Sequence, residues 1–437
     1  MRKANAFRDG VPRLFLLATC MVFGLTRPVM GQSGTWTLKA PMPTGRAGAA
    51  SAVLDGTLYV AGGYVGSAGI SIAVVEAYDP KSDAWSSKAP MLTPVSNAAA
   101  GVIDHTLYVV GGNFTDVFRS PNISELKAYD PITNSWSTRA PMPTARSNLA
   151  VVVVDGTLYA VGGQGVSGYL QTVEAYDSNS DTWTTKTPMP TPRAGLSVGV
   201  VDGILYAIGG SNASGSPGFP QTVEAYDPKS DTWTTKASIP TPRWIMASGV
   251  VDGIIYVVGG AGPGGYLQVV EAYNPKTDTW TTVAPMPTTR AALTAGVAND
   301  LLYANGGGTR FGIFVANEAF SPFLPVPIDI KPGDANNTIN LKSNGTILVA
   351  ILSTAEFGAT TVDPVTVKLA GAPVATHGRG TPMTSLADLN RDGRLDLLLH
   401  FRTQDLQLTP ASTEAVLKGK TFSGQLIRGV DLVRIVP

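Results

Sequence analysis

The stretch TVEAYDPKSDTW, Thr222–Trp233, decides the fold because the chain repeats it almost unchanged. TVEAYDSNSDTW stands at Thr172–Trp183, and VEAYNPKTDTW at Val270–Trp280. A Trp follows a Tyr by seven residues in five places, at Trp85, Trp136, Trp183, Trp233 and Trp280. Self-similarity at a fixed period indicates an architecture of stacked repeats.

Each repeat also carries a pair of glycines. The pairs are Gly62-Gly63, Gly111-Gly112, Gly162-Gly163, Gly209-Gly210, Gly259-Gly260 and Gly306-Gly307, spaced 47 to 51 residues apart. Every repeat Trp, Trp36 included, precedes the second glycine of the next pair by 27 residues. The length varies only between the glycines and the Tyr, which Phe320 replaces in the last repeat. A fixed scaffold with one variable loop per repeat is typical of a binding face.

The strands within a repeat can be read from the pattern. In AGAASAVLDGTLYVAGG, Ala47–Gly63, two apolar runs flank Asp55-Gly56, which predicts a hairpin with a type I′ turn. The turn recurs as Asp-Gly in three later repeats, whereas the second repeat has Asp104-His105, a poorer turn former. VEAYDP is a third strand and TWTTK a fourth. The sequence therefore predicts an all-β protein with four strands in each unit.

The double glycine, the Tyr and the Trp seven residues later resemble the kelch repeat over residues 36–322. The resemblance implies a six-bladed β-propeller, which we place at residues 32–322. The chain opens with a Trp strand, Thr35–Pro43, that no Gly-Gly precedes, and the last unit has Pro327 where its Trp should stand. We therefore expect the N-terminal strand to complete the sixth blade and close the ring, which would remove exposed strand edges.

An arginine follows the Trp by ten residues in five of the six repeats. In propellers that this one resembles, that position lies on the ligand face. Five guanidinium groups on one rim could bind carboxylates. Alternatively, each could pair with an acid of a neighbouring blade, from the series Glu76, Glu174, Glu224, Glu271 and Glu318. The arginines are Arg46, Arg146, Arg193, Arg243 and Arg290, and Val95 breaks the series in the second repeat.

Other candidate ligand residues lie beside these arginines and in the variable loops. Trp244 stands where the other repeats have Ala or Ser, so it either plugs the channel or offers a stacking plate for a sugar or peptide. Tyr64, Asn113, Gln164 and Asn212 lie just past the double glycines. The loops also contain Phe114, Phe118, Tyr169, Phe219 and Tyr266.

Enzyme chemistry finds little support in the sequence. Of the three histidines, only His105 lies in the propeller, and it occupies a turn, so a Ser-His-Asp triad there is implausible. Kelch copper-radical oxidases need Cys and His ligands that are missing here. Sialic-acid mutarotases, which this design resembles, need only Arg and carboxylates and form the enzymatic alternative. We expect a non-catalytic module that binds a protein or a glycan.

A second module follows the Pro-rich linker at residues 323–327. Residues 328–437 alternate short apolar runs with turns, which predicts a small β-sandwich. The stretch DLNRDGRLD resembles the DxNxDGxxD loops of FG-GAP repeats. Its oxygens could converge on Ca²⁺, although it lacks the Glu of an EF-hand and could instead be an ion-free turn. The ligands would be the side chains of Asp388, Asn390, Asp392 and Asp396, and the carbonyl of Arg394.

The N-terminus reads as a secretory signal peptide at residues 1–31. A basic segment precedes a 12-residue apolar run, Leu14–Leu25, which is too short to span a membrane. A lipoprotein signal cut before Cys20 is the alternative. Cleavage near Gly31 leaves 27 Lys/Arg and 31 Asp/Glu, a net charge of −4, and no cysteine. We therefore expect a secreted bacterial protein, periplasmic or extracellular, that is monomeric and binds no nucleic acid.

Overall fold

The structure is a computed structural model that describes residues 34–114, 121–212, 218–378 and 380–436. The predicted leader with Cys20, and the loop residue Phe118, lie outside the described residues. Within the described part, no helix is long and apolar enough to cross a membrane.

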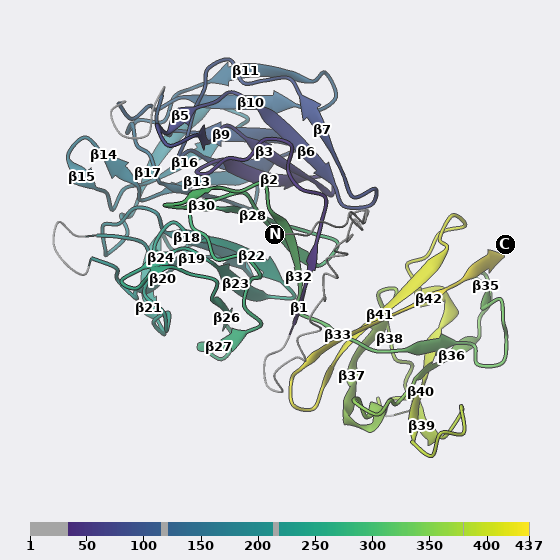
Figure 1. The fold of residues 1–437 in the computed structure, drawn as a ribbon. Coiled ribbons are helices and arrows are strands. Elements are labelled where there is room, and N and C mark those ends of the chain that lie inside the picture. The colour runs from purple at the N-terminus through teal and green to yellow at the C-terminus, as the bar shows by residue number, and fades with distance from the viewer. Residues whose placement is uncertain (1–33, 115–120, 213–217, 379, 437) are drawn as a thin grey trace, which may run out of the picture. The chain divides into compact units, whose positions relative to one another are not determined.

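The repeats form four-stranded antiparallel sheets, six of them in the described residues (Figure 1). We call each sheet a blade and number the blades along the chain by their innermost strands. From the innermost strand outward, the blades are β2-β3-β6-β7 (Ala50–Leu54, Thr57–Ala61, Val75–Asp79, Ala84–Lys88), β8-β9-β10-β11 (Ala99–Ile103, Thr106–Val110, Leu126–Asp130, Ser135–Arg139), β12-β13-β16-β17 (Ala150–Val154, Thr157–Val161, Val173–Asp177, Thr182–Lys186), β18-β19-β20-β21 (Ser197–Val201, Ile204–Ile208, Val223–Asp227, Thr232–Lys236), β22-β23-β26-β27 (Ala247–Val251, Ile254–Val258, Val270–Asn274, Thr279–Val283) and β28-β29-β32-β1 (Thr294–Ala298, Leu301–Asn305, Asn317–Ser321, Thr35–Leu38).

The sixth blade combines both ends of the repeat region. Its outermost strand is β1, which pairs antiparallel with β32 so that Thr35 faces Ser321 and Trp36 faces Phe320. The innermost strands contact one another in the order β2, β8, β12, β18, β22 and β28, and β28 contacts β2. The blades therefore follow one another around a closed cycle, with β1 completing the last sheet.

The hairpin turns between the first two strands of each blade have the predicted type I′ geometry. Asp55 and Gly56 have φ values of 49° and 76°. Asp104 and His105 in the second blade also take positive φ, at 44° and 61°. Both central residues of a type I′ turn require positive φ, so the poorer turn former His105 still adopts the same turn.

The double glycines allow neighbouring blades to approach closely. Gly162 has a φ of 60°, and a Cβ there would lie 2.6 Å from the carbonyl oxygen of Arg193 in the next blade. The N–H of Gly163 donates to that same carbonyl at 2.9 Å. A side chain at Gly162 would therefore both strain the backbone and push the blades apart.

The paired Tyr and Trp join one blade to the one before it. Tyr176 and Trp183 face each other across β16 and β17, with ring centroids 5.2 Å apart. Trp183 Nε1 donates to the carbonyl of Ala140 in the preceding blade at 2.8 Å. Asp181 Oδ1 accepts from the Tyr176 hydroxyl at 2.7 Å and from the Ala140 N–H at 2.9 Å. These contacts hold the outer edges of the blades together.

The variable gap between the second and third strands lies beyond the double glycine. In the described residues, four blades have a small hairpin here with a two-residue strand on each side. The hairpins are β4–β5 (Tyr64–Val65, Ile70–Ser71), β14–β15 (Gln164–Gly165, Gly168–Tyr169), β24–β25 (Ala261–Gly262, Gly265–Tyr266) and β30–β31 (Gly308–Thr309, Gly312–Ile313).

The C-terminal region forms a five-stranded and a four-stranded sheet that share one buried apolar cluster. The strand at Leu324–Pro325, inside the predicted linker, already pairs with this region. The first sheet is β33-β42-β41-β37-β38 (Leu324–Pro325, Leu426–Leu432, Glu414–Thr421, Val362–Leu369, Ala372–Pro373), and the second is β34-β36-β40-β39 (Ile328–Ile330, Thr346–Ile351, Asp396–Arg402, Thr384–Ala387). The strands β35 (Thr338–Asn340) and β43 (Arg434–Val436) pair with each other, and short 3₁₀ helices lie at Ala359–Thr361 and Thr403–Asp405.

Candidate functional site

The five arginines of the repeat are buried and cannot form a ligand-binding rim. Arg46 is 1% exposed, and Arg146, Arg193, Arg243 and Arg290 are 0% exposed. Each pairs with the Glu of the third strand, as Arg193 Nη2 does with Glu224 Oε2 at 2.7 Å. The other pairs are Arg46–Glu76, Arg146–Glu174, Arg243–Glu271 and Arg290–Glu318. The partner acid belongs to the same blade, not to a neighbouring one.

Each arginine ties together three segments of its own blade. Arg193 Nη1 donates to the Thr222 carbonyl at 2.7 Å, and Nη2 donates to the Ala207 carbonyl at 3.1 Å. Thr191 Oγ1 donates to the other carboxylate oxygen of Glu224 at 2.8 Å. Burial lowers the pKa of Arg193 to about 10, and the charge of Glu224 opposes that shift. The guanidinium therefore stays charged at neutral pH and has a structural role.

The sequence contained a signal for this role that the spacing of the arginines alone did not show. The second blade lacks the arginine, with Val95 in its place, and lacks the glutamate, with Lys127 in its place. Lys127 is buried and pairs with Glu125 at 2.5 Å. The Arg and the Glu are thus absent from the same repeat, which is expected if the two side chains contact each other. The Thr two residues before each Arg is a further partner that sequence reasoning missed.

The residues two positions after the five arginines, and after Val95 in the second blade, form a ring of backbone hydrogen bonds around the central channel. They are Gly48, Asn97, Asn148, Gly195, Ile245 and Ala292. Each N–H donates to the carbonyl of the equivalent residue in the preceding blade, at 2.7–2.8 Å, and Gly48 donates to Ala292 to complete the circle. All six have positive φ, between 45° and 61°. This ring forms the narrow base beneath the variable loops.

The residues just past the double glycines stand next to this ring. Tyr64 pairs with Ala47, Asn113 with Ser96, and Gln164 with Ser147. In the fourth blade the equivalent residue is Ser211, which pairs with Ala194, so Asn212 lies one position further out than predicted.

Two of the predicted polar ligand residues have different environments. Asn113 is buried, and its side chain accepts from Asn97 Nδ2 at 3.1 Å and donates to Asn122 Oδ1 at 3.0 Å. Gln164 is exposed. Asn113 is therefore held by protein partners, and only Gln164 of this pair is open to solvent.

Trp244 lies beside the ring and is partly exposed. Its ring centroid is 6.4 Å from that of Phe219, a residue of the fourth blade's variable loop. A Cβ at Gly195 would lie 3.2 Å from the indole, so the indole also covers that glycine. Trp244 thus packs against residues of the neighbouring fourth blade. Its predicted role as a stacking surface for a ligand remains a prediction.

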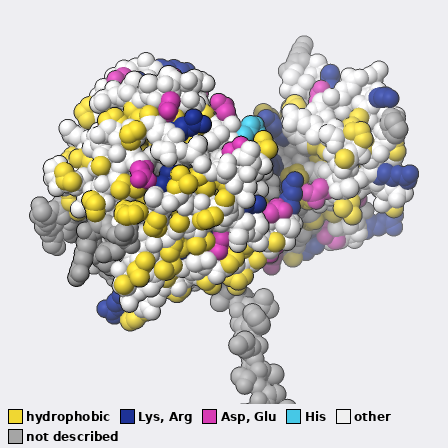
Figure 2. Space-filling model, turned by 90° about the horizontal axis from the view of Figure 1, so that it is seen from above, with side chains coloured by type: hydrophobic (Ala, Val, Ile, Leu, Met, Phe, Trp, Pro, Cys, Tyr) yellow, Lys and Arg dark blue, Asp and Glu magenta, His cyan; other side chains and the backbone are white. Residues whose placement is uncertain are grey.

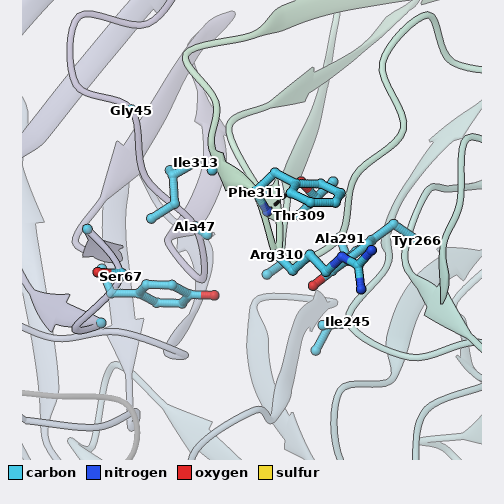
Figure 3. Close-up of a pocket in the computed structure, with 16 residues that line it drawn as sticks. Gly45, Ala47, Ser67, Ile245, Tyr266, Ala291, Thr309, Arg310, Phe311 and Ile313 are labelled. Atoms are coloured by element: carbon cyan, nitrogen blue, oxygen red, sulfur yellow. Dashed lines mark hydrogen bonds between the residues drawn. The ribbon is translucent and has the colours of Figure 1, made fainter.

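A cavity of about 680 Å³ opens on the loop side of the ring. Loops of the first, fifth and sixth blades line it, with the aromatic residues Tyr64, Tyr266 and Phe311 among them. Figure 3 shows Ser67 and Tyr266 on opposite sides, with Phe311 and Arg310 between them. The Arg310 guanidinium lies 4.6 Å from the centroid of the Phe311 ring. The Ile245 side chain belongs to the lining from the ring side.

The cavity lining consists mostly of apolar, glycine and uncharged polar residues. Among the described residues that line the cavity there is no Asp, Glu or His, and Arg310 is the one permanently charged side chain. Burial raises the pKa of Tyr64, and the nearby Tyr266 adds to this shift. Tyr64 therefore stays protonated at neutral pH, where its hydroxyl can donate a hydrogen bond.

The predicted metal loop forms a tight turn between β39 and β40. Asp388 Oδ1 accepts from the Asp392 N–H at 3.1 Å, and Asp388 Oδ2 accepts from the Gly393 N–H at 3.0 Å. Asp396 is buried and accepts from the Ser353 and Leu389 N–H groups at 2.8 and 3.0 Å. In the described residues no three His, Cys, Asp or Glu side chains are gathered to hold an ion. Each of these carboxylate oxygens accepts one hydrogen bond and has a second lone pair with which it could bind an ion. Calcium binding therefore stays a prediction.

Comparison with known proteins identifies the repeats. The kelch motif matches residues 45–92, 94–143, 145–190, 192–240 and 246–287, more than half of the chain, so the chain belongs to the kelch-repeat family. The sixth blade, assembled from both ends of the repeat region, falls outside these matches.

Relatives and solved structures show the same relationship at lower similarity. Kelch-like ECH-associated protein 1A of Danio rerio is 33% identical over 110 residues, which are 25% of this chain and 18% of that protein. Kelch-like protein 35 of Mus musculus is 32% identical over 132 residues, 30% of this chain and 21% of that protein. The matches thus span about a fifth of each relative. The structure of YjhT aligns with a TM-score of 0.55 and 18% identity over 65% of this chain and 96% of its own, which shows a shared fold.

Proposed function

We propose that this kelch propeller is a non-catalytic binding module whose ligand, a protein segment or a glycan, enters the cavity on the loop side of the ring. The observation that carries the proposal is the cavity of about 680 Å³ with Tyr64, Tyr266 and Phe311 in its walls. Ligand sites in proteins are concave, largely apolar and of this size. Aromatic side chains offer flat apolar faces together with polar edges, which suits sugar rings and peptide side chains.

A sugar isomerase of the mutarotase type is less well supported. Such an enzyme needs an acid and a base within reach of the substrate. The buried glutamates that could serve are each bound by an arginine and a threonine of their own blade. The described cavity lining contributes only tyrosines and one arginine as titratable groups.

The charge distribution agrees with a protein or glycan ligand in preference to nucleic acid. On the face drawn in Figure 2, basic and acidic side chains are scattered among hydrophobic and uncharged ones. Nucleic-acid binding requires a continuous basic surface, because neutralising phosphates supplies most of the affinity. We further propose that the protein is exported and monomeric, and that its C-terminal region forms a β-sandwich.

Glycan and peptide arrays probed with the full chain test the proposal. We expect a retained ligand whose signal falls at least tenfold in Tyr266→Ala. The matched control is Tyr169→Ala. Tyr169 has the same place in the third blade's hairpin as Tyr266 has in the fifth, and both tyrosines belong to the sequence GYLQ. Tyr169 does not line the cavity. Equal loss in both variants, or turnover of an acidic sugar by the purified protein, contradicts the proposal.

A further inference from the structure

Ile245 adopts a backbone conformation that its side chain disfavours. Its φ is 45°, in the left-handed region, where a β-branched residue is a genuine outlier. The five equivalent ring positions carry Gly48, Asn97, Asn148, Gly195 and Ala292. Gly and Asn tolerate this conformation, and Ala lacks branching. The fifth blade alone has a bulky branched residue here.

The ring prevents Ile245 from relaxing. Its N–H donates to the Gly195 carbonyl at 2.7 Å, and its own carbonyl accepts from the Ala292 N–H at 2.8 Å. A change of φ to the ordinary range would break two of the six bonds of the ring. The strain is therefore imposed by the architecture and persists in the folded protein.

Packing in the core does not explain why a branched residue stands at this position. The side chain is only partly buried, and it lines the cavity that Tyr266, Arg310 and Phe311 also line. With Ala47, Ala291 and Ala292 it makes the ring side of that cavity apolar. Strained residues that persist at cavity walls point to a role in binding.

We propose that Ile245 is a specificity-determining residue that contacts an apolar or aromatic group of the ligand at the base of the cavity. This inference rests on the proposed function in that the cavity must admit a ligand. The ligand then carries a compact apolar group that reaches the ring, while its polar part stays near Arg310 and the tyrosine hydroxyls.

Benzyl alcohol is a suitable probe because it combines a compact aromatic ring with a hydroxyl. The full chain, labelled with ¹³C at its isoleucine δ1 methyl groups, is titrated with the alcohol to about 10 mM, enough for a millimolar Kd. We expect a saturable shift of the Ile245 methyl and none for Ile132, which is 90% exposed on a turn. An Ile245 methyl that does not move overturns the inference.

Two reciprocal variants separate strain from binding. Ile245→Asn installs the residue of two other ring positions, so the Tm should rise by about 2 °C or more while saturable binding of benzyl alcohol is lost. Asn148→Ile creates the same strain away from the cavity, so it should lower the Tm and leave binding unchanged. An Ile245→Asn protein with a Tm no higher than wild type, or with unchanged binding, overturns the inference. Because the probe is independent of the arrays, silent arrays would defeat the proposed function separately.

Discussion

The indole of Trp36 packs against the ring of Phe320, with centroids 5.2 Å apart, although 283 residues separate them in the chain. Trp36 Nε1 also donates to the Ala284 carbonyl of the fifth blade at 2.9 Å. In the other blades the Trp makes the same two contacts within its own sheet and to the preceding blade. The N-terminal strand therefore takes the structural place of the missing fourth strand.

The arginine–glutamate pairs should govern stability. Arg193→Ala leaves the buried Glu224 carboxylate without its counter-charge, so we expect a loss of about 3–5 kcal/mol in the free energy of unfolding. The double variant Arg193→Ala/Glu224→Ala should lose clearly less than the sum of the two single variants. Denaturant unfolding of the four proteins measures this. Additive losses would mean that the two side chains act independently.

Acid should weaken the contacts between blades. Hydrogen bonds from Tyr hydroxyls and backbone N–H groups lower the pKa of Asp83, Asp181, Asp231 and Asp278. A folded-state pKa below the unfolded one stabilises the fold above the unfolded value, and this contribution disappears as the pH falls through the folded value, below about pH 4.

The second blade supplies the control for that pH dependence. Asn134 accepts the same two bonds without a titratable group, from the Tyr129 hydroxyl and the Ala89 N–H. Changing all four aspartates to asparagine should therefore flatten the fall in Tm between about pH 5 and pH 3. An undiminished fall in the quadruple variant would assign acid sensitivity to other groups.

Asn317 should fasten the segment that follows the N-terminal strand. It is buried where the other blades have Val or Leu, and its Nδ2 donates to the Ala40 carbonyl at 3.1 Å. Its own carbonyl accepts from the Lys39 N–H at 3.0 Å. In Asn317→Val we expect the Lys39 amide to exchange with solvent at least tenfold faster, as measured by NMR hydrogen exchange.

Asn305 is the matched control for the hydrogen bond between Asn317 and Ala40. It faces Asn317 across the same sheet and is equally buried. Its side-chain amide makes no hydrogen bond to any described residue. Asn305→Val should leave exchange at Lys39 unchanged. Equal effects of the two variants would show that exchange at Lys39 depends on the polarity of these two positions and not on the hydrogen bond to Ala40.

Calcium should stabilise the C-terminal region if its loop holds the ion. We expect Ca²⁺ in the millimolar range to raise the Tm of this region relative to EDTA. Asp392→Asn should abolish the shift, and Asp405→Asn, an exposed carboxylate outside the loop, should not. Identical melting in Ca²⁺ and EDTA would favour an ion-free turn.

The repeat scaffold was predictable because its spacing reflects fixed contacts. The seven-residue step from Tyr176 to Trp183 is the length of one hairpin, and Gly162-Gly163 marks the approach of the next blade. The arginines were harder to interpret, because a series of five cations fits both a rim and buried pairs. Two observations decide for buried pairs: the second repeat lacks both the Arg and the Glu, and the structure buries all five arginines.

The cavity residues were largely hidden from sequence reasoning. Arg310 and Phe311 lie in a loop whose length and composition vary, so no spacing marks them. Ile245 stood next to the conspicuous Trp244, but its importance depends on a positive φ that the sequence of one blade does not reveal. Comparison of the six equivalent ring positions gives that signal once the ring is known.

A disulfide between Thr35→Cys and Ser321→Cys tests most directly whether the N-terminal strand completes the last blade. These residues are directly opposed in β1 and β32, and the natural chain has one cysteine, Cys20, in the predicted leader. Mild oxidation should form the cross-link quantitatively and raise the Tm, because it closes a very long loop. A control pair, Thr37→Cys with Ser321→Cys, is out of register and should stay reduced. Cysteines at Thr35 and Ser321 that stay reduced in the folded protein would contradict closure of the ring by β1.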